Sequence, residues 1–142
     1  MIIVPDASVI LKWVLEKASE PDQVQARWLQ EAILFDQVTI ALPALWRFEV
    51  GNVLGLKQSK LAQELFSVLM AYGFEEVYLG KEYAMEVLEH MREVKGVTFY
   101  DSAYHVLAIR MKGLYLTADN AYVKKAKQKG HVTLLSEWEW RS

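Results

Sequence analysis

The sequence predicts an α/β domain in which a parallel sheet of about five short strands is covered by helices on both faces. Two observations support this class. Short apolar runs alternate with longer helical segments, the pattern of strands that are buried on both faces. The chain has 142 residues, 53 % of them hydrophobic and 24 % charged, which is ordinary for one folded domain spanning residues 1–142.

Five apolar runs are the expected strands, and punctuating residues close the first two, at Pro5 and Pro43. The expected strands are residues 2–4, 38–42, 75–79, 114–117 and 132–135. Pro43 also suits the first turn of the helix that follows, and Ser59 suits an amino-terminal cap. The expected helices are 7–17, one starting at Pro21, 43–56, 59–72, 81–94, 98–111 and 119–129.

Composition excludes several classes of protein. Without cysteine there can be no disulfide and no thiolate metal site, and the three histidines lack zinc spacing. A formal net charge of −2 gives no overall attraction to nucleic acid. No uninterrupted apolar stretch is long enough for a membrane span, and the apolar start lacks the basic leader of a signal peptide, so we expect a cytoplasmic protein.

Four acidic residues are the main functional candidates: Asp6, Glu49, Asp101 and Asp119. Asp6 and Asp119 each lie just beyond the carboxyl end of an expected strand, the edge at which ligands bind in parallel α/β folds. Carboxylates that converge repel one another and cannot all stay ionised unaided. A divalent cation with oxygen ligands is the usual remedy, and such a site is typical of phosphodiester chemistry.

Three of these acids also have a purely structural interpretation. Asp6 suits the cap of the helix that follows it, and Asp119 suits the cap of the last, basic helix. Thr98 and Asp101 have the spacing of a capping box. Taken singly, capping and catalysis explain these residues equally well, and only convergence of the acids favours a site.

Glu49 fits a structural interpretation less easily. On a helix it is expected beside Asn52, on one face with the apolar residues Leu45, Trp46, Val53 and Leu56. A lone carboxylate buried there would cost several kcal/mol without a partner. The face therefore either borders a cleft or places Glu49 on a ligand.

Four motifs in order along the chain resemble those of PIN-domain ribonucleases: DAS after the first strand, E-x-x-N, YDSAY and LTAD. The likeness covers the chain from Asp6 to the last strand, and it is greatest to VapC-type toxins of bacterial and archaeal toxin–antitoxin pairs. It implies a single PIN-like nuclease domain with a twisted parallel sheet, helices on both sides, and a negatively charged pocket that binds Mg²⁺ or Mn²⁺.

The resemblance also implies a site. It makes the four acids, Asp6, Glu49, Asp101 and Asp119, both the catalytic and the metal-binding residues. Ser8 and Thr117 match hydroxyls that support ligands or water, and Asn52 matches an amide beside the glutamate. Two departures stand out. Ala121 replaces a further acid that some members carry, which would weaken a second metal site, and His105 takes a position that is usually apolar.

The function expected from this site is metal-dependent endoribonuclease activity. With a cation held chiefly by Asp6 and Asp101, water would attack in line and leave a 5′-phosphate and a 3′-hydroxyl. Glu49 or Asp119 would orient that water or complete a second site. The resemblance adds an RNA substrate, a small antitoxin that holds the toxin inactive, and a homodimer.

Other residues have two interpretations each. The basic residues Lys124, Lys125, Lys127 and Lys129 would complement a helix carboxyl terminus or grip RNA phosphates. The residues Trp13, Trp28 and Trp46 would be core or would line a groove for a partner. We expect His105 to be packed behind the site, His90 and His131 to lie on the surface, and Trp138 and Trp140 to fold back onto the domain.

Two other functions compete with the nuclease. One is a catalytically inactive PIN-like module that binds RNA or protein, against which the retention of all four acids argues. The other is an aspartate-nucleophile phosphatase, which also has an aspartate after the first strand. Those enzymes require a second aspartate two residues after the first, where this chain has Ser8.

Overall fold

The structure is a computed structural model that describes residues 1–15 and 22–140. Its five strands form one parallel sheet in the order β3-β2-β1-β4-β5. The strands are β1 (Ile2–Pro5), β2 (Thr39–Pro43), β3 (Glu75–Val77), β4 (Leu114–Thr117) and β5 (Val132–Leu134). The predicted fold class and sheet are therefore confirmed.

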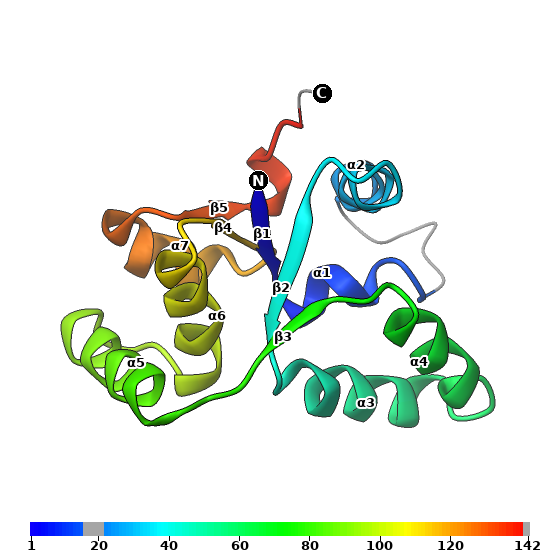
Figure 1. Cartoon of the computed structure of the whole chain (residues 1–142), viewed down its shortest axis with the longest axis horizontal. Coiled ribbons are helices and arrows are strands. Elements are labelled where there is room, and N and C mark those ends of the chain that lie inside the picture. The colour runs from blue at the N-terminus through cyan, green and yellow to red at the C-terminus, as the bar shows by residue number, and fades with distance from the viewer. Residues whose placement is uncertain (16–21, 141–142) are drawn as a thin grey trace.

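Helices cover both faces of this sheet. The α-helices are α1 (Ala7–Leu11), α2 (Gln23–Leu34), α3 (Trp46–Lys57), α4 (Ala62–Met70), α5 (Lys81–Glu93), α6 (Phe99–Arg110) and α7 (Asn120–Ala126). Two short 3₁₀-helices, η1 (Lys127–Lys129) and η2 (Leu135–Glu137), flank β5. In Figure 1, α5, α6 and α7 lie on one side of β1 and β2, while α1, α2, α3 and α4 lie on the other. No helix in the described ranges is long and apolar enough to cross a membrane.

The central strand β1 pairs in parallel with β2 on one side and β4 on the other, where Ile3 aligns with Ile40 and with Leu114. The chain leaves β1 toward β2 and leaves β4 toward β5, so the connections diverge at this point. In open parallel sheets such a switch point forms a crevice at the carboxyl ends of the strands. The fold therefore has its natural ligand position next to Asp6.

The core lies around β1, β4 and α6. Ile3 and Val4 are fully buried, and every residue of α6 from Ser102 to Ala108 is buried. This burial explains why α6 is apolar nearly all round, as the sequence indicated. Gly113 allows α6 to turn into β4 close to β1, because a Cβ there would lie 2.5 Å from the Ile2 carbonyl oxygen.

Several element boundaries differ from the sequence prediction. Pro43 does not begin a helix: it is the last residue of β2 and aligns with Val77 of β3, and α3 begins at Trp46. Ser59 is not a cap, since α4 is preceded by Leu61 at its N-cap position, without a side-chain capping bond. The fixed φ of proline suits the end of a strand as well as the start of a helix, so Pro43 alone did not decide between these two structures.

The first and last predicted helices are shorter than expected. Helix α1 ends at Leu11, and residues 16–17 of its predicted range lie outside the described residues, as does Pro21. Helix α7 ends at Ala126 and continues as the 3₁₀-helix η1, so the predicted 119–129 segment is helical in two forms. Boundaries of this kind follow from tertiary packing, which local patterns do not record.

Candidate active site at the carboxyl edge of the sheet

The topology brings the four predicted acids to one edge of the sheet, and we call them the acidic edge: Asp6, Glu49, Asp101 and Asp119. Asp6 directly follows β1, and Asp119 is separated from the end of β4 by Ala118. Glu49 and Asp101 stand in the first turns of α3 and α6. Helices in such folds run antiparallel to the strands they connect, so their amino termini lie at the carboxyl edge.

Asp6 is the centre of this edge. Its backbone N–H extends the ladder by donating to the Leu116 carbonyl at 2.8 Å. Its Oδ2 accepts hydrogen bonds from the Ser8 hydroxyl at 2.8 Å and from the Thr117 hydroxyl at 3.3 Å. Asp6 occupies the N-cap position of α1 but makes no side-chain capping bond. The capping interpretation is therefore wrong for Asp6, and its carboxylate is held by two hydroxyls instead.

The electrostatics of the edge are those of like charges gathered with partial burial. Burial, followed by the charge of Asp101, raises the pKa of Asp6 to about 6, although the Ser8, Ala7 and Thr117 hydrogen bonds oppose the shift. Burial also raises the pKa of Glu49, with smaller contributions from the charges of Asp6 and Asp101. The pKa of Asp101 is raised by burial and then by the charge of Asp119. Asp6, Glu49 and Asp101 are therefore each affected by the charge of another acid of the edge.

Glu49 is half-buried and has a partner that the sequence did not reveal. The Tyr104 hydroxyl donates to Glu49 Oε1 at 2.7 Å, from a fully buried side chain of α6. The predicted apolar stripe was wrong in detail, because Leu56 is 78 % exposed and Asn52 is exposed as well. The buried residues of α3 are Trp46, Val50 and Leu54. Glu49 thus borders the core rather than lying inside it.

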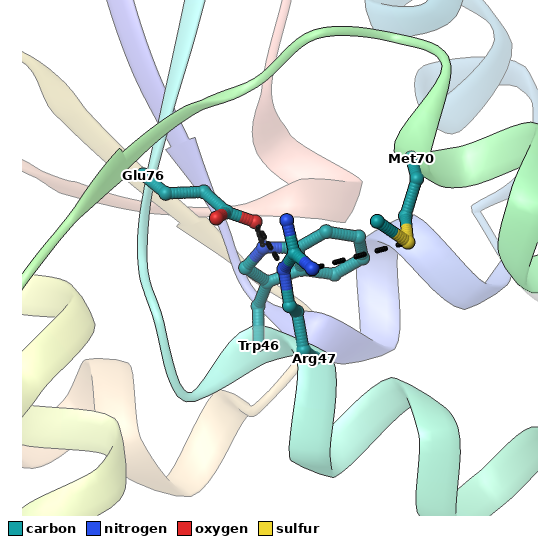
Figure 2. A network of polar contacts seen from close by, with 4 residues as sticks. All are labelled: Trp46, Arg47, Met70 and Glu76. Atoms are coloured by element: carbon teal, nitrogen blue, oxygen red, sulfur yellow. Dashed lines mark hydrogen bonds and ion pairs between the residues drawn. The ribbon is translucent and has the colours of Figure 1, made fainter.

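The start of α3 is fixed to β3 and α4 by a polar network (Figure 2). Glu76 Oε1 accepts hydrogen bonds from Trp46 Nε1 at 2.6 Å and from Arg47 Nε at 2.7 Å. Arg47 also reaches the Met70 sulfur at 4.0 Å. Glu49 lies two residues after Arg47 on the same helix, so this network fixes the position of Glu49 at the acidic edge.

Asp119 has a structural role as well, and Asp101 lies next to a cap that Thr98 provides. The Thr98 hydroxyl accepts a hydrogen bond from the Asp101 backbone N–H at 3.1 Å, which caps α6. Asp119 Oδ1 accepts one from the Tyr122 backbone N–H at 3.0 Å and caps α7. Thr117 links the two ends of the edge, since its hydroxyl reaches Asp6 and accepts from the Asp119 backbone N–H at 3.1 Å. The capping interpretation is therefore confirmed for Asp119 and for Thr98.

The donor set suits a hard cation, because it consists of carboxylates and hydroxyls. Among residues 1–15 and 22–140, however, no three Asp, Glu, His or Cys side chains form a group that could hold a metal ion by themselves. Mg²⁺ is commonly bound through one or two carboxylates, with waters and substrate phosphate completing its shell. The edge fits that open mode of binding and does not fit a closed protein cage.

Behind the edge lies a buried polar network that sequence reasoning missed. Tyr122 Oη is 2.7 Å from His105 Nδ1 and 3.0 Å from His90 Nε2, and His105 Nε2 is 2.7 Å from the Gly130 carbonyl oxygen. A carbonyl only accepts, so His105 carries its proton on Nε2, Tyr122 donates to Nδ1, and His90 donates to Tyr122. Burial lowers the pKa of His105 to about 4, which keeps this imidazole neutral.

The prediction that His90 lies on the surface was therefore wrong, whereas His105 is packed as expected and His131 is exposed. The pattern of α5 carries a signal that points to His90, because it shares the buried face with Tyr83 and Val87 at helical spacing. Nothing in the sequence identifies its partner Tyr122, which comes from a helix that is distant along the chain.

Two of the four predicted basic residues have structural partners. Lys125 Nζ donates to the Gly96 carbonyl at 2.9 Å, and Lys129 pairs with Glu93 at 2.9 Å. Among the tryptophans, Trp46 and Trp138 are buried, while Trp13 and Trp28 are half-buried. Trp138 is buried in the core and Trp140 packs against it, so these two residues fold back onto the domain as expected.

The fold and the edge together define a class: a parallel α/β domain with carboxylates at its topological switch point. Residues 3–128 match the model of the PIN domain family, and the chain therefore belongs to this family. A comparison with curated protein sequences found no match.

Three solved structures share the fold. FitAB bound to an IR36 DNA fragment is 19% identical with a TM-score of 0.72, over 100% of both chains. VapBC2 from Rickettsia felis, bound to a DNA fragment from its promoter, is 14% identical with a TM-score of 0.70, over 99% of this chain and 100% of that one. PAE2754 from Pyrobaculum aerophilum is 22% identical with a TM-score of 0.64, over 95% of this chain and 84% of that one.

Proposed function

We propose that residues 1–142 act as one PIN-like nuclease domain, a metal-dependent endoribonuclease that serves as the toxin of a toxin–antitoxin pair. The observation that carries the proposal is the acidic edge itself. Four carboxylates from four separate segments lie at the switch point of a PIN domain, and burial, with smaller contributions from neighbouring acidic charges, raises the pKa of Asp6, Glu49 and Asp101. Perturbed carboxyls in a shared site are typical of catalytic centres.

Asp6 and Asp101 are the chief candidates to hold Mg²⁺ or Mn²⁺, with Glu49 and Asp119 beside them. When bound, the cation would polarise the RNA phosphodiester and lower the pKa of a water. The Ser8 and Thr117 hydroxyls both donate to Oδ2 of Asp6, and this fixes the orientation of its carboxylate. Glu49, with Oε1 held by Tyr104, is the group proposed to orient the attacking water and take up its proton. Asn52 is exposed on α3 and would contact substrate rather than complete the acidic edge.

A small antitoxin is the proposed protein partner. FitAB and VapBC2, each bound to a DNA fragment, share the fold, and the VapC-type toxins that the sequence motifs resemble are held inactive by small antitoxins. An apolar surface on this chain is consistent with such a partner: Phe48 and Leu56 of α3 are 80 % and 78 % exposed. A cavity of about 370 Å³ between α3 and α4 is lined by Leu54 and Phe66, among others. A homodimer and a cytoplasmic location remain part of the proposal.

The test is cleavage of a mixed pool of tRNA, rRNA and mRNA by the purified protein, with and without EDTA. We expect products with 5′-phosphate ends that appear only when Mg²⁺ or Mn²⁺ is present. Cleavage that EDTA leaves unchanged would contradict the metal-dependent mechanism. Co-purification of a small protein with the chain expressed from its native locus tests the toxin assignment separately.

A further inference from the structure

The hydrogen bond between Tyr104 and Glu49 joins two elements that each carry an acid of the edge. Tyr104 stands one helical turn after Asp101 on α6, and its hydroxyl donates to Glu49 Oε1 of α3 at 2.7 Å. A glutamate side chain has three rotatable bonds, so it adopts one orientation only where a neighbour holds it. Here the neighbour is on the helix that begins with Asp101.

The ring of Tyr104 is itself firmly held. It stacks on Tyr115 of β4 with centroids 5.9 Å apart and planes 18° from parallel. The ring of His105 also stacks on Tyr115, with centroids 5.8 Å apart and planes 28° from parallel. Both nitrogens of His105 are hydrogen-bonded, to Tyr122 and to Gly130, so the whole stack has a fixed base. A residue that orients a functional side chain must itself be held in place by packing and hydrogen bonds, as the ring of Tyr104 is.

We propose that Tyr104 is a positioning residue of the acidic edge, which fixes the Glu49 carboxylate against α6 so that Glu49 and Asp101 act on the same cation or water. The inference rests on the proposed function and names one more residue of its machinery. Tyr104 touches neither substrate nor cation, and it acts through Glu49 alone. Removing its hydroxyl therefore loosens Glu49 without removing a charge.

The chain supplies a matched control in Tyr83. Tyr83 is also buried, at 2 % exposure, and its hydroxyl also donates a hydrogen bond to α6. Its acceptor, however, is the backbone carbonyl of Ala103 and not a carboxylate of the edge. Tyr104→Phe and Tyr83→Phe each remove one buried hydroxyl while keeping the ring, so any general effect of losing such a bond appears in both.

The measurements are Mn²⁺ affinity by calorimetry and the kcat and KM of RNA cleavage. For Tyr104→Phe we expect Mn²⁺ affinity or kcat to fall about 10- to 100-fold, with KM for RNA unchanged. Tyr83→Phe should stay within about twofold of wild type in both quantities, because it has no contact with the edge. Glu49→Asp, which keeps the charge but is too short to reach Tyr104, should behave like Tyr104→Phe and serves if the latter does not fold.

A double-variant cycle separates positioning from general packing. In a Glu49→Ala background, Tyr104→Phe should cause no further loss, because the group it positions is gone. The inference is overturned if Tyr104→Phe still lowers Mn²⁺ affinity or kcat in the Glu49→Ala background. It is also overturned if wild type binds Mn²⁺ and cuts RNA but Tyr104→Phe has the same Mn²⁺ affinity and kcat as Tyr83→Phe. A wild type that neither binds Mn²⁺ nor cuts RNA would instead overturn the proposed function, and the inference with it.

Discussion

Two acidic regions of this molecule use the same residue types in opposite ways. On helix α5 each of three glutamates has a basic partner: Glu86 pairs with Arg110, Glu89 with Arg92 and Glu93 with Lys129. At the acidic edge, none of the four carboxylates takes part in an ion pair between described residues. Their partners are hydroxyls and backbone N–H groups instead.

The difference has a direct electrostatic consequence. The hydrogen bond from Arg92 lowers the pKa of Glu89, as expected for a carboxylate beside a cation. Asp6, in contrast, has its pKa raised to about 6 by burial and by the charge of Asp101. Acids that merely stabilise a surface are neutralised by the protein itself. The acids of the edge have no basic partner among the described residues, and burial disfavours the charged form of Asp6.

The largest expected effect comes from removing one charge of the edge. Asp6→Asn and Asp101→Asn should each lower RNA cleavage by more than about a hundredfold, since each removes a proposed metal ligand and not merely a supporting group. Thermal unfolding of both variants should show a folded protein. Retention of full cleavage by either folded variant would remove that residue from the machinery.

The next effect is a pH dependence of stability in the metal-free protein. A carboxyl whose pKa is raised by folding contributes stability below its unfolded pKa of 3.8, and that contribution is lost as the pH rises through about 6. For Asp6 the loss amounts to at most about 3 kcal/mol. Denaturant unfolding in EDTA should therefore show a free energy of unfolding that falls between pH 4 and pH 7. This fall should be smaller in Asp6→Asn than in wild type. Parallel curves for the two proteins would show that Asp6 has no raised pKa.

The smallest effect is expected on the paired side of the comparison. Glu93→Gln breaks the contact with Lys129, a partly exposed ion pair, and should lower the free energy of unfolding by less than about 1 kcal/mol. RNA cleavage should not change, because Glu93 lies on α5 and has no contact with the edge. A large loss of cleavage in this variant would mean that charge in general, and not the edge, governs activity.

Much of this architecture could be predicted from local patterns. Apolar runs predicted the strands, and the acids that follow β1 and β4 could be placed at one edge because parallel strands end together. The dual role of Asp119, as cap and as edge residue, follows from its position alone. The sequence pattern wrongly placed Leu56 on the buried face of α3, whereas its side chain is exposed. A periodic pattern records that a residue is apolar but not whether a neighbour covers it.

What the sequence could not supply is the set of contacts between distant segments. Tyr104 and Glu49 are 55 positions apart, and His90 and Tyr122 are 32 apart, so no local spacing predicts either hydrogen bond. Burial of His90 was open to prediction from its helical face, but its bonding was not. Long-range polar partners are decided by packing, and they are therefore the part of the site that only the structure reveals.

The most direct test of the central claim is a calorimetric titration with Mn²⁺ of four proteins: wild type, Asp6→Asn, Asp101→Asn and, as the matched control, Glu93→Gln. We expect binding to wild type and to Glu93→Gln with equal affinity, and binding more than about tenfold weaker in the two edge variants. Equal affinity in all four proteins, or no wild-type binding tighter than millimolar, would show that Asp6 and Asp101 do not hold a metal ion.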